Sequence, residues 1–598
     1  MSEKHEERAS VESSDESLVA KGDAPQVGVL AAEAARSVAG WKIWVAFLGI
    51  ALVAYVTGLD NNTMYAYLQA AATHMNKYPL YIAVSTTQGV IIAVGKFPVA
   101  KLADVFGRAE GYAISLFMYI IGFIIIASCQ NFGALIAGTV FYAFGNTGTQ
   151  IMQQIVLADI TTTKWRGVAV SLITLPYIIN FGVAPLITQD LASNSLSNLW
   201  RWGPGSFAIV FPVAAAPIIL SLALTQRKAK KEALAPRHPY LSMSPLQGLK
   251  AFLVDIDALG LLLLCAGFLL ILLPLSLESV AAKGYESPHI DVMFAVGGAC
   301  IVALPFQQYF LSPKPIFRRH FVLNKDVAIP ALAIGFFDFA SFYISWTPAY
   351  YWVQVTHPDW TVKDATYFSN TQSLSLTIFG IAAGFIILGL KRYKYLLLAG
   401  TCIRMLGLGL MIRYRDATST TAQVVIPQII QGMGGGIQGL LIQLAAQVSV
   451  RHQHVAMVTA FVLLMTELGG SVGSAIVGAI QNKVLLTQLN EKLGAVGVSA
   501  AEITSAFASP TTVTWAVGSP ERNAFIAAWN EYMHVVLIAG ICLAAVPIIG
   551  TLFLTDHKLG DGQNCVSDEL VGGRINRRYD RDDGQGLQYE NRPEHTHA

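Results

Sequence analysis

Apolar runs of about twenty residues alternate with short polar connections along most of the chain. The runs lie near residues 43–72, 80–101, 110–128, 132–158, 167–188, 205–225, 256–278, 292–310, 327–353, 366–390, 395–412, 422–449, 455–481 and 532–555. Since a helix of about 20 apolar residues crosses the hydrocarbon core of a bilayer, each run predicts one membrane-spanning helix. The pattern therefore predicts an all-α, polytopic membrane protein with fourteen spans.

Lysine and arginine gather in alternate connections between these runs. The basic connections are 101–108, 164–166, 226–238, 313–320, 391–394 and Arg451. The intervening connections carry few such residues, with "RYRD" at 413–416 as the exception. Because cytoplasmic loops of membrane proteins are the ones enriched in Lys and Arg, both termini are predicted to lie in the cytosol.

The same pattern divides the chain into six parts. We predict a disordered cytosolic tail, a six-helix bundle, a cytosolic loop, two extra spans, a second six-helix bundle and a cytosolic tail: 1–40, 41–225, 226–255, 256–325, 326–555 and 556–598. Within the second bundle, residues 482–530 are too polar for a span and are predicted to form a long extracellular loop.

Composition narrows the class of protein further. Hydrophobic residues make up 54% of the chain and charged residues 13%, against about 25% charged residues in soluble domains. The formal net charge of +2 gives no reason to expect nucleic acid as a partner. The six cysteines form no CxxC pair, so neither a disulfide framework nor a zinc site is expected.

The connection after the second run, "AKLADVFGRAE" at 100–110, resembles the loop motif G-x-L-A-D-R-x-G-R of the major facilitator superfamily. The matching residues are Leu102, Ala103, Asp104, Gly107 and Arg108, whereas Ala100 and Val105 differ from the motif. Asp159 and Arg166 lie in "VLADITTTKWRG" on the same predicted side. We interpret Asp104, Gly107, Arg108, Asp159 and Arg166 as parts of a cytosolic gate.

A narrower resemblance rests on longer stretches. "LDNNT", "AKLADVFGRAEGY", "YIIGFIIIASCQNFGALIAGTVFYAFGNTG" and "VLADITTTKWRG" look like the fungal siderophore-iron transporters, a fourteen-span branch of the superfamily. The similarity is densest over 55–205. It implies a monomeric carrier, with no cofactor, that imports ferric siderophores, hydroxamate types favoured, by proton symport and alternating access. The plasma membrane is the favoured location, with an endosomal or vesicular membrane as the alternative.

Three other functions stay open at this point. Fourteen-span drug:proton antiporters typically carry G-x-x-x-G-P-x-x-G-G in span 5, but this span reads "SLITLPYIINFGVAPLITQDL", which favours import. A proton-coupled glutathione or small-peptide exchanger is the third interpretation. A membrane receptor for siderophores is the fourth, although a receptor needs no proton-binding acids.

Uncharged polar residues line one face of two corresponding spans. Asn146, Gln150 and Gln153 follow one another at helical spacing in span 4, and Gln428, Gln431 and Gln438 do so in span 12. Because transporter sites lie near the midplane between repeats, these stripes are predicted to bind substrate. Amide side chains also hold transmembrane helices together, so helix packing is the competing interpretation.

Three acidic residues lie inside predicted spans: Asp60, Asp338 and Glu467. A charged side chain in a bilayer costs about 2.5–3.5 kcal/mol on insertion scales, so such residues usually serve a function or meet a partner. We interpret them as candidate proton-coupling residues. Structural pairing with a partner that the sequence does not reveal is the alternative.

Further polar and aromatic residues lie near the outer ends of spans 1 and 9. Asn61, Asn62, Tyr65, Tyr67, Trp346 and Tyr350 are predicted to contact the substrate. No histidine falls in the middle of a span, and no Cys, Met or carboxylate pair has ligand spacing within one helix. We therefore expect no metal site, and a cargo that arrives as an intact iron chelate.

Overall fold

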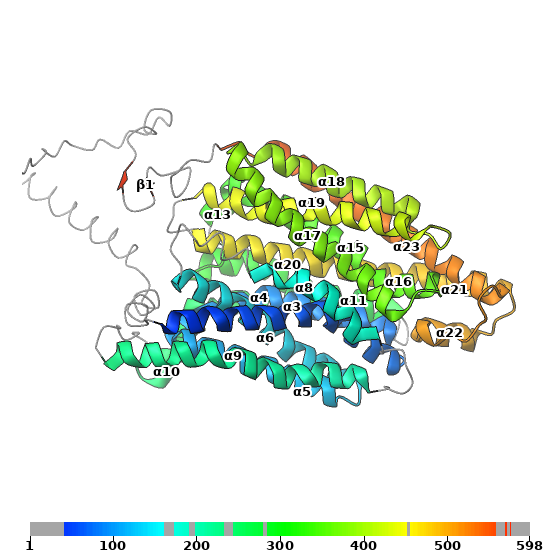
Figure 1. Ribbon diagram of the computed structural model, residues 1–598, viewed down its shortest axis with the longest axis horizontal. Coiled ribbons are helices and arrows are strands. Elements are labelled where there is room, and N and C mark those ends of the chain that lie inside the picture. The colour runs from blue at the N-terminus through cyan, green and yellow to red at the C-terminus, as the bar shows by residue number, and fades with distance from the viewer. Residues whose placement is uncertain are drawn as a thin grey trace, which may run out of the picture.

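The computed structural model describes residues 41–160, 173–189, 198–231, 243–278, 284–317, 319–450, 455–557, 569–570 and 574–575. The predicted N-terminal tail 1–40 and most of the C-terminal tail therefore lie outside the described residues, as does Arg166. The described residues are almost entirely helical (Figure 1). Their one pair of strands is β1 (Glu569–Leu570) with β2 (Arg574–Ile575), antiparallel and two residues long.

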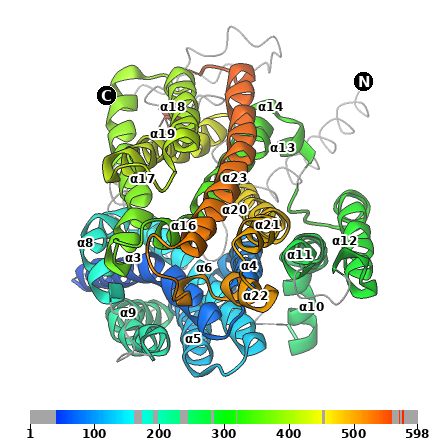
Figure 2. The same cartoon turned by 90° about the vertical axis from the view of Figure 1, so that its right-hand side faces the viewer.

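The first part of the chain forms one group of helices. It comprises α3 (Lys42–His74), η1 (Tyr78–Leu80), α4 (Tyr81–Val105), α5 (Arg108–Ser128), α6 (Phe132–Ile160), α8 (Pro176–Thr188) and α9 (Leu199–Lys231). It is followed by α10 (Pro245–Asp255), α11 (Ala258–Leu277), η6 (Gly284–Glu286), α12 (Pro288–Phe306), η7 (Gln307–Leu311) and α13 (Arg319–Leu323). Helices α11 and α12 pack against each other beside α4 (Figure 2).

The remaining part forms a second group. It comprises α14 (Lys325–Ala328), η8 (Ile329–Gly335), α15 (Phe336–Trp346), α16 (Ala349–Thr356), α17 (Val362–Leu390), α18 (Lys394–Tyr414), α19 (Thr421–Val448), α20 (Val455–Ile480), η10 (Gln481–Leu485), α21 (Leu486–Ala495), α22 (Ala500–Ala508), η11 (Pro510–Thr512) and α23 (Pro520–Phe553). The segments η7, η8 and η10 are π-helices. Segment η8 immediately precedes the turn that carries Asp338.

Twelve of the described helices are long and apolar enough to cross a membrane. The two other predicted spans, 132–158 and 167–188, correspond to α6 and α8. Helix α6 is long enough to cross a membrane, but its amide side chains make it less apolar than the twelve helices counted above. Helix α8 shows only its last 13 residues within the described part of the chain. The fold is thus that of a multi-pass membrane protein, and fourteen spans are consistent with it.

The two groups share one packing plan. Helix α3 packs on α8 and α9, α5 packs on α6 and α9, and α4 packs on α6. In the second group α15 packs on α20 and α23, α18 packs on α19 and α23, and α17 packs on α19. Helix α3 is therefore the counterpart of α15, and α5, α6 and α9 are the counterparts of α18, α19 and α23. The groups meet where α4 runs along α20 and where α8 runs along α17.

The long helices run side by side and give the molecule two ends (Figure 1). One end carries α10 and α13, and we call it the α10 end. The opposite end carries α16, α21 and α22, and we call it the α22 end. Helix α3 starts at the α10 end and finishes at the α22 end.

The segment predicted as the loop 482–530 is largely helical. Helix α20 continues through η10 and α21 to Ala495, and α23 already begins at Pro520, where the Ser519 hydroxyl accepts a hydrogen bond from the backbone N–H of Arg522. Leu485, Leu489 and Leu493 are fully buried. Their four-residue spacing marks one apolar face of α21. The opposite face is polar, so the mean hydropathy of the segment does not reveal the apolar face.

Candidate functional site

Asp60 lies at the centre of a buried polar cluster in the first group of helices. Its carboxylate oxygen Oδ2 accepts hydrogen bonds from the hydroxyl of Tyr119 on α5 and, at 2.9 Å, from that of Tyr142 on α6. Its other oxygen, Oδ1, has no hydrogen-bond partner among the described residues. The side chain is fully buried, so two neutral phenols, not a cation, hold this acid.

Two glycines let α5 and α6 approach closely enough to bring these phenols together. A Cβ at Gly145 would overlap the backbone of Tyr119, and one at Gly122 would overlap the backbone of Tyr142. Each tyrosine therefore lies directly opposite a glycine of the neighbouring helix. The absence of two side chains is what places both hydroxyls at Asp60.

The network extends from Asp60 through residues predicted from the sequence. The amide of Asn146 donates to the Tyr119 hydroxyl at 2.8 Å and to Oδ1 of Asn61 at 3.1 Å. The amide of Gln150 donates to Oδ1 of Asn146 at 2.6 Å. Asn61 in turn donates to the hydroxyl of Tyr177 on α8 at 2.7 Å. The structure thus brings Asp60, Asn61, Asn146 and Gln150 into one continuous network.

Three other predicted residues of this group lie apart from the network. Asn62 donates to the carbonyl of Gly58 in its own helix at 2.9 Å, and its carbonyl accepts from Asn370 of α17 at 3.3 Å. Gln153 is buried. Tyr67 is buried against α9, where a Cβ at Gly203 would overlap its ring. Their contact with substrate stays a prediction.

The second group carries an acid on the counterpart helix α15 but gives it a different partner. Asp338 of α15 forms an ion pair with Arg404 of α18, with 3.0 Å between Oδ1 and Nε, and both side chains are almost completely buried. A Cβ at Gly434 of α19 would overlap the backbone of Arg404, as Gly145 does with Tyr119. The pair α5–α6 therefore presents a phenol to Asp60, and its counterpart α18–α19 presents a guanidinium to Asp338.

The amide stripe of α19 faces its own neighbours. Gln431 donates to the Ser345 hydroxyl at 2.8 Å and accepts from the amide of Gln372 on α17. Gln428 accepts from Arg415 at 2.6 Å. Gln438 is fully buried on the same helix. The stripe is therefore part of the second group's interior.

Arg415 belongs to the "RYRD" segment that breaks the predicted alternation of basic loops. The structure buries its guanidinium, which also donates to the carbonyl of Ser345 at 2.6 Å. A buried arginine held by protein groups does not report on loop orientation. Its position thus accounts for part of the exception.

Glu467, the third predicted acid, is paired with a lysine of the other group. Its Oε1 lies 3.1 Å from Nζ of Lys96 on α4. Among the described residues, each of the three intramembrane acids therefore has a different kind of partner: phenols at Asp60, a guanidinium at Asp338 and an ammonium at Glu467.

Aromatic residues join the two groups near the α22 end. The ring of Tyr65 on α3 lies 5.4 Å from those of Trp346 and Tyr350, measured between centroids. Close by, the hydroxyls of Thr73 and Tyr351 are 2.6 Å apart. Tyr65, Trp346 and Tyr350 were predicted to contact substrate. In this conformation Tyr65 packs against the other two rings, and these contacts help to close this end.

Of the predicted gate residues, Gly107 and Arg108 lie in the fully described part of the chain. Gly107 has φ of +118° and precedes α5, a conformation that favours glycine. The Gln226 side chain of α9 lies against it, placed for its amide to accept from the backbone N–H of Arg108. Asp104 and Asp159 lie in the last turns of α4 and α6, and the positions of their side chains lie outside the described part.

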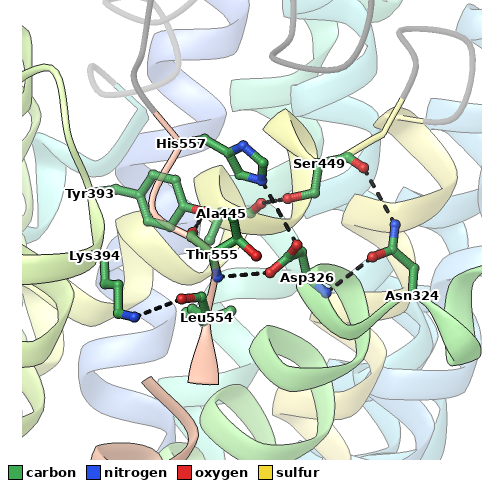
Figure 3. A network of polar contacts seen from close by, with 9 residues as sticks. All are labelled: Asn324, Asp326, Tyr393, Lys394, Ala445, Ser449, Leu554, Thr555 and His557. Atoms are coloured by element: carbon green, nitrogen blue, oxygen red, sulfur yellow. Dashed lines mark hydrogen bonds and ion pairs between the residues drawn. The ribbon is translucent and has the colours of Figure 1, made fainter. Parts of the chain in front are cut away.

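The corresponding connection in the second group is tied to the chain that follows α23 (Figure 3). The Tyr393 hydroxyl donates to the carbonyl of Thr555 at 2.6 Å, and Lys394 donates to that of Leu554 at 2.7 Å. The backbone N–H of Thr555 donates to Asp326 at 3.0 Å, and His557 lies 3.8 Å from the same carboxylate. The first group thus fastens this connection to its last helix, α9, and the second group fastens it to the residues that directly follow its last helix, α23.

Sequence reasoning missed several residues of these clusters: Lys96, Tyr119, Tyr142, Tyr177, Gln372, Arg404 and Arg415. The lysine and Arg404 carried a usable signal, because each is a lone cation inside an apolar run. The tyrosines carried none, since an aromatic residue in a span is compatible with either packing or a polar role.

Comparisons with known proteins identify the family. The profile of the Major Facilitator Superfamily matches residues 46–474. "Siderophore iron transporter mirC" of Emericella nidulans is 34% identical over 561 residues, covering 92% of this chain and 90% of the relative. "MFS siderochrome iron transporter C" of Aspergillus fumigatus is 33% identical, covering 86% and 84%. "Low affinity heme transporter str3" of Schizosaccharomyces pombe is 29% identical, covering 87% and 83%.

Solved structures agree on the fold. A bacterial homologue of the human lysosomal transporter Spinster, in an inward-facing and unoccupied conformation, superposes with a TM-score of 0.55 at 14% identity. The match covers 86% of this chain and 97% of that protein. At this identity the likeness concerns the arrangement of helices alone.

Proposed function

Because the chain belongs to the siderophore iron transporter family of the major facilitator superfamily, we propose that it imports ferric siderophores with protons by alternating access. The assignment of the cargo rests on the 34% identity to a siderophore iron transporter over 92% of the chain. The protein is a membrane transporter, not an enzyme.

The charges of the interior favour a neutral cargo. Within the described residues no group of three His, Cys, Asp or Glu side chains is placed to hold a metal ion. Among the described residues, the intramembrane cations Lys96 and Arg404 are neutralised by Glu467 and Asp338, and the buried guanidinium of Arg415 is held by hydrogen bonds to Gln428 and the Ser345 carbonyl. A ferric ion bound by three singly charged hydroxamates is neutral overall, whereas a tricatecholate carries excess negative charge. Since burying an uncompensated charge is costly, we favour the hydroxamate chelates.

The contacts between the groups support an alternating-access cycle. At the α22 end Thr188 of α8 lies 3.0 Å from Thr366 of α17, hydroxyl to hydroxyl. The Thr73–Tyr351 contact and the Tyr65 ring cluster lie at the same end. We assign the α22 end to the outer face, since the basic connections predict that α3 starts in the cytosol. The conformation seen here would then be closed to the outside.

Asp60 is the best candidate for the coupling site. Asp338 and Glu467 each neutralise a cation, so protonating either would leave Arg404 or Lys96 unpaired. Asp60 is held by two neutral phenols, and one of its oxygens has no partner among the described residues. It can therefore accept and release a proton without leaving a buried cation uncompensated.

The function can be tested by uptake of radiolabelled iron into cells that lack other siderophore carriers. Iron would be offered as a ferric trihydroxamate, a ferric tricatecholate, heme and the unchelated ion, with cells carrying an empty vector as the control. We expect saturable uptake from the trihydroxamate and vector-level uptake of the unchelated ion. Uptake of unchelated iron, or uptake of heme alone, would overturn the assignment.

A further inference from the structure

The ion pair between Lys96 and Glu467 joins the two groups of helices within the membrane region. Lys96 belongs to α4 and Glu467 to α20, and 3.1 Å separates Nζ from Oε1. The lysine side chain is 6% exposed and that of the glutamate 21%. Attraction between opposite charges is strong where little water screens it, so this contact resists separation of α4 from α20.

The pair ends a row of close contacts between these two helices. A Cβ at Gly478 would contact Ile82, and one at Gly89 would overlap Ser471. On α4 the contacting residues 82, 89 and 96 recur every seven positions, about two helical turns. Because α4 starts at the α22 end, Lys96 makes the contact of this row that lies farthest from that end.

Local structure turns both side chains toward the seam. A Cβ at Gly95 would contact Thr147 of α6, which fixes one face of α4 against its own group and leaves Lys96 facing α20. Pro98, inside α4, removes one backbone hydrogen bond next to the lysine. On α20, Gly469 and Gly470 pack on Phe336 and Tyr343 of α15, while Glu467 faces α4.

We propose that Lys96 and Glu467 form an electrostatic latch that holds α4 against α20 and keeps the α22 end closed. The proposal rests on the proposed transport function, because a latch has a role only if the groups move apart during the cycle. Glu467 is the more exposed partner of the pair. Lys96 is then a positioning residue for transport, and Glu467 acts as its counter-ion, not as the coupling acid.

The latch can be tested by disulfide formation across the seam. An ideal Cβ at Gly89 lies 3.5 Å from that of Ser471, within the range that a disulfide requires. Gly89→Cys and Ser471→Cys would be introduced into a chain whose six native cysteines are replaced. The rate of oxidation would be compared for the native charges, Lys96→Met, Glu467→Gln, the double variant K96M/E467Q, and the exchanged pair K96E/E467K.

We expect at least a tenfold slower cross-link in both single variants and in K96M/E467Q, and recovery to within threefold in the exchanged pair. The double variant buries no unpaired charge, so it decides the question if a single variant fails to reach the membrane. Cross-linking at the native rate in K96M/E467Q would overturn the latch. Cross-linking needs no cargo, so absence of siderophore uptake by the native chain would refute the proposed function and leave this result standing.

Discussion

Replacing Asp60 with asparagine tests whether this residue couples transport to protons. Asparagine has nearly the same shape, and its carbonyl oxygen can accept from Tyr119 and Tyr142 as the carboxylate does. Its NH2 group takes the place of the oxygen that has no partner among the described residues. We expect a stability loss of about 1 kcal/mol, the size of one weakened hydrogen bond, so Asp60→Asn should fold and reach the membrane.

The size of the coupling effect follows from the free energy of a proton gradient. One pH unit corresponds to about 1.4 kcal/mol per proton, or a tenfold change in an equilibrium. If one proton accompanies each chelate, the native protein should accumulate its cargo about tenfold further per unit of pH difference. Asp60→Asn should equilibrate the chelate across the membrane and show no dependence on the gradient.

The assay is uptake of a ferric trihydroxamate into proteoliposomes with an imposed pH difference and a membrane potential clamped at zero. Tyr142→Phe is the matched control, because it removes one donor to Asp60 and keeps the carboxylate. It should retain the dependence on pH even if uptake is slower. If Asp60→Asn accumulates cargo with the native slope, Asp60 is not the coupling residue and the argument from counter-charges fails.

Arg404→Met should lower the free energy of unfolding by about 3–5 kcal/mol, because it leaves Asp338 as an unpaired buried charge. In a detergent melting experiment, the double variant D338N/R404M should be clearly more stable than Arg404→Met. Equal stability of the two variants would contradict this account. An epitope inserted at the exposed Gly494 should be labelled on intact cells if the α22 end faces outward at the cell surface, whereas labelling of a C-terminal tag on intact cells would refute the orientation. Although burial by itself raises the pKa of Asp255, the ammonium groups of Lys314 and Lys101, at 2.6 and 3.2 Å, hold that pKa below its ordinary value. The stabilisation from these two ion pairs is therefore present above the unfolded-state pKa of Asp255 and is lost as the pH falls through the folded-state pKa. Because pH 6 and pH 8 both lie above these values, D255N should reduce the free energy of unfolding by at most about 1 kcal/mol, equally at both. A reduction that grows between pH 6 and pH 8 would contradict this account.

The site residues that could be predicted from the sequence are polar residues inside apolar runs, because placing such groups in lipid is unfavourable. Asp60 and the Asn146–Gln150 face follow from the price of polar groups in lipid and from helical spacing, and both belong to the observed network. Tyr119 could not be predicted as their partner, since its role depends on which glycine of α6 faces it. That information lies in the packing of two helices and not in either sequence segment.

Burial changes what a charge or an average polarity indicates about a segment. Arg415 was counted as a loop charge, although its guanidinium is buried against Ser345 and Gln428. The segment 482–530 was judged by its average polarity, which hides the buried leucine face of α21. Both cases show that position around a helix, more than composition, decides whether a residue meets water or protein.

The π-helical winding of segment η8 determines where the charges that follow it are placed. A π-helix turns by less per residue than an α-helix, so it holds about one residue more over the same rotation. If residues 329–335 wound as a regular α-helix instead, the residues that follow would rotate by about 100°, and Asp338 would turn away from Arg404. A change in winding, with every side chain retained, would then leave both charges unpaired. Deleting one residue from 329–335 should instead restore regular winding and keep Asp338 facing Arg404.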